Sequence, residues 1–411
     1  MAPGGWRRDA FRFCQIYLVY FLPITFLVYL ILESYQIDFR SFYLAGKSVL
    51  QGLDPYLNYV GVRPEFYGPV NSEVSPTSGF RYPPLAALVF VPIATLPYQT
   101  AKALFSLAMI AILGVLSFHL VRRSGFRAPG EAILFMLVSF PVLALTERGQ
   151  VDSFVLYLTA LSYWLGLSSR RTAVASFLLA FAGIFKLFPL VVLIFYGVER
   201  RWRFISFTVL WGILLFVLPY AYFGGEVYGH FWSRTFPDYF GPITTDLPLE
   251  LHGQGVVLNK IVQSKDAIDL LVTHDFVNGF MNPLLSSSTV GSVISGLILT
   301  GLLLIAIHRC PKDFQFYAFL NVINLYNPVA WIMGLVWYIP LFLYLSPRTT
   351  KLGQFLSLLP LFMPPFLNTN AIWAYLLSIV FALAIRSPSW GRYLLIDAAS
   401  VEAAAVPKPS A

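Results

Sequence analysis

The stretch GSVISGLILTGLLLIAI, residues 291–307, contains no charged side chain. Uncharged runs of the same kind recur at residues 16–32 and 206–222. A bilayer core of about 30 Å needs roughly 20 apolar residues per helical span. Because hydrocarbon cannot satisfy a free backbone amide, such runs must be helical or packed among helices. The sequence therefore predicts an all-α polytopic membrane protein.

The composition supports this class. Of 411 residues, 57% are hydrophobic and 12% are charged, whereas soluble domains carry about 25% charged residues. The net charge of +8 comes from basic residues scattered between apolar runs, which is typical of topology signals and excludes a nucleic-acid partner. Two distant cysteines, dispersed histidines and the absence of HExxH or CxxC predict no cofactor and no dedicated metal site, while dependence on a divalent metal is left open.

Basic clusters separate the apolar runs, and positive residues favour the cytosolic side of a membrane. If these clusters and both termini lie in the cytosol, that side holds 18 Lys and Arg against 6 Asp and Glu, and the outer side 9 against 14. This pattern predicts a bundle of about twelve transmembrane helices. The expected spans are 15–33, 100–121, 131–146, 152–168, 172–186, 187–199, 203–223, 289–307, 314–326, 329–346, 352–367 and 371–385.

Two long segments are expected outside the cytosol, at about 34–99 and 224–288. Both are rich in aromatic residues, Gly and Pro, and loops of this length are usually functional or disordered. We expect them to fold over the membrane, with residues 85–96 as an interfacial or re-entrant helix. Residues 1–395 then form a single membrane domain, and residues 396–411 a disordered cytosolic tail.

Asp38 follows the first expected span and stands among Phe39, Phe42 and Tyr43. A carboxylate at such a boundary is partly desolvated, which favours a role as general base; an ordinary loop aspartate is the alternative. Further along, Arg81 and Tyr82 precede two prolines that fix the backbone. Arg81 is suited either to binding a phosphate or to anchoring the chain at the interface.

Polar side chains also gather between two apolar runs in TERGQVDSF, which contains Glu147, Arg148, Gln150 and Asp152. Charges at a membrane boundary are costly unless they face a cavity or each other. Lys186 is flanked by apolar sequence on both sides, so its ammonium requires a partner. A lipid phosphate is one candidate partner; an ion pair with Asp152 or Glu147 that holds helices together is the other. We expect helices to break at the outer interface near Lys186 and Asn327.

Several short motifs occur in one order along the chain, and no nucleotide-binding motif is present. They are Asp38 with YLAG at 43–46 and GLDPY at 52–56, YPPL at 82–85, GQVD at 149–152, AGIFKLFP at 182–189 followed by ERRWR, and NPVAW at 327–331. Together these motifs resemble glycosyltransferase family 87, which includes mannosyltransferases and arabinofuranosyltransferases. The resemblance runs from about residue 36 to 345.

The resemblance implies a GT-C-like helical bundle with an outer cavity. It implies transfer of a sugar, such as the hexose mannose, from a polyprenyl-phosphate donor to a lipid or glycan acceptor, with inversion. By this analogy Asp38 is the catalytic base, and Lys186, Arg148 and Arg81 bind the donor phosphate. The expected cavity residues are Tyr43, Tyr82, Glu147, Gln150, Asp152, His252, Gln254, Asn327 and Trp331.

One departure from the family pattern concerns the residues after NPVAW. Relatives often have histidines there, whereas this chain has Met333 and Gly334. The departure leaves the acceptor chemistry open. Two other functions remain as alternatives: a multi-pass secondary transporter or lipid flippase, and a non-catalytic membrane assembly subunit.

Overall fold

The computed structural model describes residues 21–33, 36–57, 59, 66, 80–126, 129–236, 289–326, 332–362 and 370–396. Within these ranges the secondary structure is helical, and the β-pairing consists of an isolated bridge between Thr349 and Leu395. The prediction of an all-α fold is confirmed for this part of the chain.

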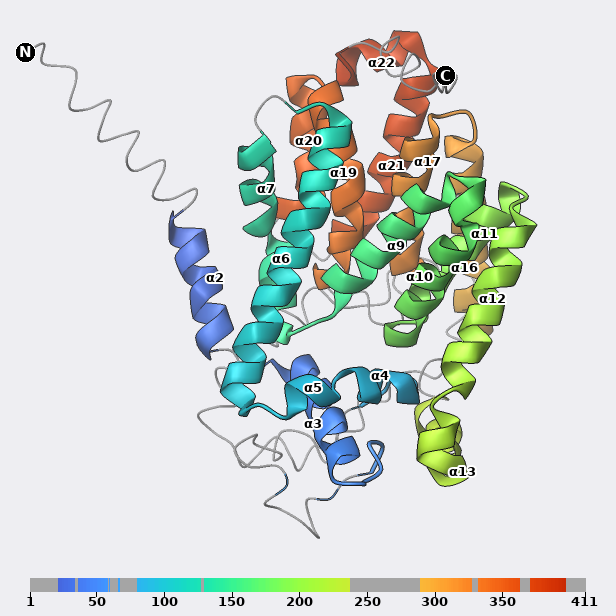
Figure 1. Ribbon diagram of the computed structural model, residues 1–411. Coiled ribbons are helices and arrows are strands. Elements are labelled where there is room, and N and C mark those ends of the chain that lie inside the picture. Colours follow the sequence, from blue (N-terminus) through green and yellow to red (C-terminus); the bar gives the residue numbers. More distant parts are fainter. Residues whose placement is uncertain are drawn as a thin grey trace, which may run out of the picture.

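Most helices form one bundle (Figure 1). Its members are α2 (Leu22–Glu33), α6 (Tyr98–Ser124), α7 (Pro129–Leu137), α8 (Phe140–Arg148), α9 (Asp152–Gly166), α10 (Thr172–Phe185), α11 (Val192–Val198), α12 (Trp202–Val217), α16 (Thr289–Ile307), α17 (Lys312–Phe319), α18 (Ile323–Tyr326), α19 (Ile339–Leu345), α20 (Lys351–Phe362) and α21 (Asn370–Arg386). Shorter helical turns connect them, among them η4 (Phe188–Val191), η9 (Ile332–Tyr338) and η10 (Ser346–Arg348).

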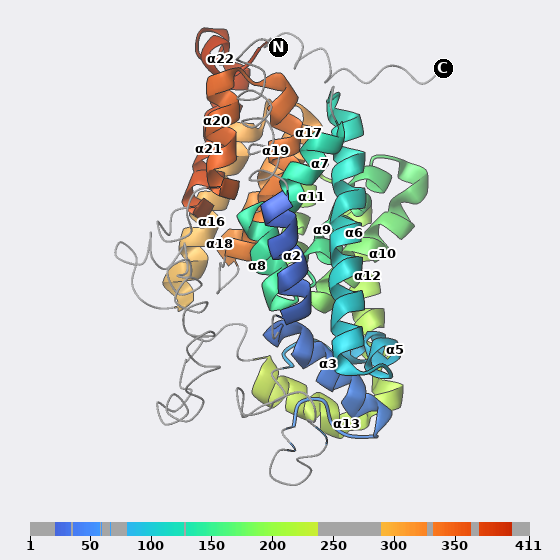
Figure 2. The same cartoon turned by 90° about the vertical axis from the view of Figure 1, so that its left-hand side faces the viewer.

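A layer of helices lies across one end of the bundle, at the bottom of Figures 1 and 2. It comprises α3 (Ile37–Leu50), α4 (Pro84–Val89), α5 (Val91–Ala94) and α13 (Tyr220–His230). The short helix α22 (Pro388–Leu394) lies at the opposite end (Figure 1). Helices α3, α4 and α5 come from a segment that was expected to lie outside the cytosol, whereas α13 begins within the expected span 203–223 and continues into the second such segment. We call these four helices the end layer.

By length and apolar composition, α6 alone among the described helices is sufficient to cross a membrane; α12 joined to Tyr220–Ser233 is a second such segment, bent by 88°. The expected count of about twelve spans is therefore not confirmed. Several expected spans are divided into shorter helices: 131–146 falls into α7 and α8, and 329–346 begins as η9 before α19. Prolines explain these breaks, since Pro141 and Pro340 begin new helices and proline cannot continue a helix from its N-terminal side.

Basic residues gather at the α22 end of the bundle. Arg348 donates to the backbone oxygen of Ser124 at 3.2 Å, directly after the Arg122–Arg123 pair of α6. Arg386 donates to the oxygen of Ala306 at 3.3 Å. On the neighbouring helices, Arg201 donates to Gly166 and Lys312 pairs with Glu199, each at 2.6 Å. Clusters that are far apart in the sequence are thus collected away from the end layer.

The end layer is held together by a close backbone contact and by stacked rings. A side chain on Gly46 of α3 would place its Cβ 2.6 Å from the oxygen of Phe90, between α4 and α5, so this position requires glycine. The Phe42 ring stacks on Tyr82 and Phe90, with centroids 4.2 and 4.4 Å away. Because Phe42 is one helical turn after Asp38, this packing fixes the helix that carries the candidate base.

Candidate active site

Asp38 lies in the first turn of helix α3, within the first segment that was expected to fold outside the membrane. The residue before the helix, Gln36, has φ 53° and ψ 61°, which is the left-handed region. Non-glycine residues rarely adopt this conformation. The chain thus turns sharply at Gln36, and Asp38 is presented by a rigid helix whose Phe39 and Phe42 are fully buried.

The Asp38 carboxylate forms an ion pair with an arginine from a distant helix. Arg148, the last residue of α8, donates from Nε to Oδ2 of Asp38 at 3.0 Å, and the two side chains are 14% and 22% exposed. In the described part of the chain, Oδ1 of Asp38 has no hydrogen-bond partner. One carboxylate oxygen is therefore held in place while the other remains accessible.

A tight corner joins α8 to α9, and it contacts the start of α3 directly. Gly149 ends α8 with φ +69°, and a Cβ there would lie 2.6 Å from Cβ of Phe39 and 2.9 Å from Cβ of Gln36. Both the positive φ and the close approach demand glycine. The corner continues through Gln150 to Asp152, the first residue of α9.

The second ion pair of the site lies on the other side of this corner. Helix α10 ends at Phe185, and Lys186 is extended, with φ −151° and ψ 128°. Its Nζ lies 2.6 Å from Oδ2 of Asp152, with the side chains 15% and 4% exposed. The expected break near Lys186 is present, and its partner in the structure is Asp152, which is the ion-pair alternative.

The two ion pairs therefore meet at one short segment of chain. Arg148 and Asp152 are four residues apart, and they hold Asp38 and Lys186 respectively. Two cation–anion pairs are thus gathered at a corner between α3, α8, α9 and α10. Burying charged side chains at the edge of an apolar bundle costs free energy, and charges retained in such places commonly mark a functional site.

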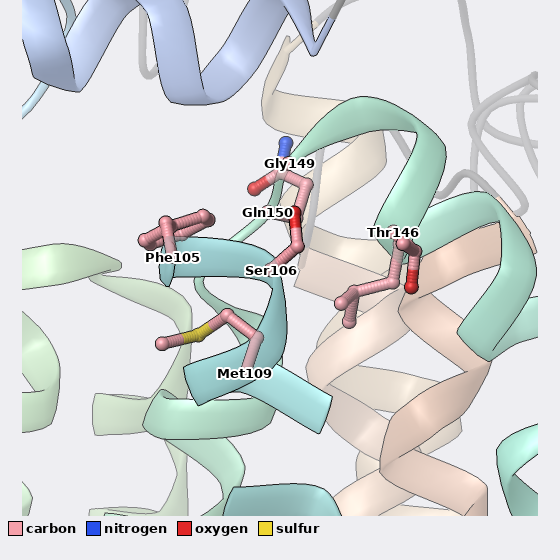
Figure 3. A pocket seen from close by; sticks show the side chains of 7 residues that line it. Phe105, Ser106, Met109, Thr146, Gly149 and Gln150 are labelled. Carbon is pink, nitrogen blue, oxygen red and sulfur yellow. The ribbon is translucent and has the colours of Figure 1, made fainter. Parts of the chain in front are cut away.

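A small cavity lies behind the corner, between α6 and α8 (Figure 3). Its empty volume of about 150 Å³ includes open solvent, and no part of it is wide enough to hold a water molecule. The side-chain oxygen Oε1 of Gln150 is buried there and has no hydrogen-bond partner among the described residues. The lining residues are Phe105, Ser106, Met109, Leu145, Thr146, Gly149 and Gln150.

The other expected site residues fall into three groups. Tyr43 is buried in the end layer, where its hydroxyl donates to the oxygen of Leu96 at 2.8 Å and burial raises its pKa, so it acts as a structural donor. Tyr82 stacks on α3 as described above, with the exposed Arg81 beside it, and Glu147 is half-buried in the last turn of α8. His252, Gln254, Asn327 and Trp331 lie outside the described residues.

Sequence reasoning missed two polar contacts of the site region. Gln36 donates from Nε2 to Ser106 Oγ at 2.6 Å and to the oxygen of Thr146 at 3.1 Å. In the end layer, His230 Nδ1 lies 2.6 Å from Oδ2 of Asp54. The Asp-Pro pair of the GLDPY motif is a turn signal, but no local pattern indicates the contact with His230 or marks Gln36.

A metal site is not assembled by the described residues, among which no group of three His, Cys, Asp or Glu side chains is close enough to hold an ion. The two aspartates of the corner region, Asp38 and Asp152, are each engaged by a cation.

The fold and the site define a helical protein that has an apolar bundle and a charged corner where the bundle meets the end layer. Residues 80–326, more than half of the chain, match glycosyltransferase family 87, and the chain belongs to this family of membrane glycosyltransferases. The matched region includes Arg148, Asp152 and Lys186, whereas Asp38 precedes it. No curated protein and no solved structure matches the chain closely enough to be compared with it.

Proposed function

We propose that this chain transfers a sugar from a polyprenyl-phosphate donor to a lipid or glycan acceptor on the non-cytosolic face of the membrane, with inversion and with Asp38 as general base. The observation that carries the proposal is that Asp38 and Lys186 pair with Arg148 and Asp152, two residues four positions apart at the corner between α8 and α9. A base and a cationic phosphate site must lie on either side of the reacting carbon, and this corner brings such groups together.

The side of the membrane follows from the basic residues at the α22 end of the bundle. Since positive residues favour the cytosol, the α22 end faces the cytosol, and both termini are assigned to that side. The end layer and the start of α3 then face the opposite compartment. In the orientation we propose, Asp38 faces the compartment in which a lipid-linked donor, and not a cytosolic nucleotide sugar, delivers the substrate.

Asp38 has the geometry of a general base. Arg148 holds Oδ2 in one orientation, which leaves Oδ1 to accept the proton of an acceptor hydroxyl. As the hydroxyl oxygen attacks the anomeric carbon, the bond from that carbon to the phosphate oxygen breaks on the opposite face. The proton ends on Asp38, and the sugar changes its anomeric configuration.

Lys186 is the group we assign to the departing phosphate, with Arg81 as a second cation at the rim. Arg148, which the family resemblance also assigns to the phosphate, lies on the side of the base, where it holds Asp38. An ammonium has three N–H donors, of which Lys186 uses one on Asp152. Cations placed where negative charge develops stabilise the transition state more than the ground state. Mannose is the sugar that the family resemblance favours.

The test is transfer by the purified protein in detergent or liposomes. Radiolabelled polyprenyl-phosphate mannose is supplied as donor together with a lipid extract as acceptor, and a nucleotide-linked mannose is supplied in a parallel reaction. We expect labelled glycolipid from the lipid-linked donor alone. Transfer from the nucleotide sugar alone would contradict the proposed donor. Movement of labelled lipid across the liposome membrane without any transfer would favour the transporter alternative.

A further inference from the structure

We propose that Gln36 is a positioning residue for Asp38, an inference that rests on the proposed function. Its buried carboxamide fastens the start of α3 to α6 and α8, so that the Asp38 carboxylate stays within reach of Arg148. Three independent observations support this role: the backbone conformation of Gln36, its two hydrogen bonds, and the contact of Gly149 with the same residue.

The backbone of Gln36 adopts a conformation that glutamine disfavours. Its φ of 53° and ψ of 61° lie in the left-handed region, which glycine and asparagine tolerate far better. A strained residue persists only where surrounding contacts impose its conformation, and such residues cluster at functional sites. Here the strained residue stands two positions before the candidate base.

The side chain of Gln36 supplies the contacts that impose this conformation. It is 1% exposed, and its Nε2 donates both to Ser106 Oγ of α6 and to the oxygen of Thr146 near the end of α8. The Thr146 carbonyl is one of the last in its helix, so the carboxamide also caps α8. The same amide thereby fixes the two helix ends from which Asp38 and Arg148 project.

The packing at the corner leaves little freedom for a different arrangement. Gly149 approaches the Cβ atoms of both Gln36 and Phe39 so closely that a methyl group would not fit. Helix α3 has no side-chain cap of its own at its N-terminus. Without the Gln36 amide, the first turn of α3 would be attached to α8 through the Asp38–Arg148 pair alone among the side-chain hydrogen bonds described above.

The consequence is a loss of alignment, since displacement of a catalytic group by about 1 Å costs up to ~100-fold in rate. Gln36→Met removes the two hydrogen bonds and keeps the side-chain length. Gln36→Gly removes them and also relieves the left-handed strain. The matched control is Gln51→Met, because Gln51 lies at the other end of the same helix, exposed and in an unstrained conformation.

The experiment measures kcat, the KM for polyprenyl-phosphate sugar, and thermal unfolding for the purified variants. We expect both Gln36 variants to lower kcat about 10- to 100-fold with KM changed less than about twofold, and Gln51→Met to behave as wild type. We also expect Gln36→Met to leave kcat unchanged in an Asp38→Asn background, because the base that Gln36 positions is then absent. A purely structural role would lower the unfolding temperature without this coupling.

If Gln36→Met does not fold, Ser106→Ala serves instead, because it removes one of the two acceptors and should lower kcat several-fold. The inference is overturned if kcat of folded Gln36→Met and Gln36→Gly stays within about twofold of wild type, or if their effect persists undiminished in Asp38→Asn. Absence of transfer by the wild-type protein would instead overturn the proposed function, so the two failures are distinguishable.

Discussion

Arg148 donates from Nε to the Asp38 carboxylate at 3.0 Å although 110 residues separate the two in the chain. This contact fastens the end layer to the bundle at the point where α8 turns into α9. It also determines which carboxylate oxygen is open to a substrate.

Removing both charges of the Lys186–Asp152 pair should restore stability but not activity. Lys186→Met leaves the Asp152 carboxylate buried without its cation, which typically costs about 3–5 kcal/mol. The double variant Lys186→Met/Asp152→Asn removes both charges and should regain most of that stability. We nevertheless expect transfer to remain low in the double variant, because the phosphate-binding cation is absent.

These outcomes are measured by thermal unfolding in detergent and by the rate of sugar transfer. Lys312, which forms an exposed pair with Glu199 at the opposite end of the bundle, offers the control: Lys312→Met should change both quantities little. Full recovery of transfer in the double variant would show that Lys186 has a structural role only.

Gly149 should tolerate no side chain. Gly149→Ala adds the strain of a positive φ, about 1–2 kcal/mol, and an overlap with Phe39 and Gln36 that adds about 1–3 kcal/mol. Gly125→Ala is the control, since Gly125 has φ +78° and no heavy atom lies within 4 Å of the place its added methyl group would occupy. Chemical or thermal unfolding of both variants measures the difference, and equal destabilisation would contradict the close approach at the corner.

The contact between Asp54 and His230 should stabilise the docking of α13 on the segment after α3. Asp54 also accepts a hydrogen bond from the backbone N–H of Tyr56 at 2.8 Å, which asparagine can replace. We expect Asp54→Asn and His230→Phe to be non-additive, with a coupling of about 0.5–3 kcal/mol. A double-mutant cycle in unfolding free energy measures it, and additive effects would show that the pair contributes nothing.

Cysteine labelling should place the end layer outside the cytosol. In a Cys14→Ser background, with the buried Cys310 retained, single cysteines are introduced at three exposed positions. These are Gln51 directly after α3, Ser233 three residues after α13, and Ser389 of α22. A membrane-impermeant maleimide on intact cells should label the first two, and Ser389→Cys only after permeabilisation. The reverse pattern would invert the topology.

The sequence predicted the helical class because uncharged runs such as residues 289–307 and 371–385 leave few alternatives, and the structure has α16 and α21 there. It did not predict the division of residues 131–146 into two helices or the 88° bend after α12. Apolar composition indicates whether a segment lies in the membrane, whereas proline positions and tertiary packing decide where its helix ends.

For the site, local pattern identified the charged residues and a candidate partner for Lys186, but not the partner of Asp38. Lys186 was recognisable because an isolated charge among apolar residues must be paired, and Asp152 was one of the partners considered. The Arg148–Asp38 pair and the role of Gln36 depend on contacts between α3 and α8 over more than 100 residues. Such contacts leave no periodic signal in one sequence, and nothing in the sequence indicates that a glutamine adopts the left-handed backbone conformation.

The transfer rate of Asp38→Asn, relative to wild type, tests most directly whether Asp38 is the base. Glu226→Gln, which neutralises an exposed carboxylate of the end layer, is the control, and thermal unfolding verifies that all three proteins are folded. Loss of a general base should lower the rate about 10²- to 10⁴-fold, with Glu226→Gln unchanged. Transfer by folded Asp38→Asn at the wild-type rate would contradict the role of Asp38 in catalysis.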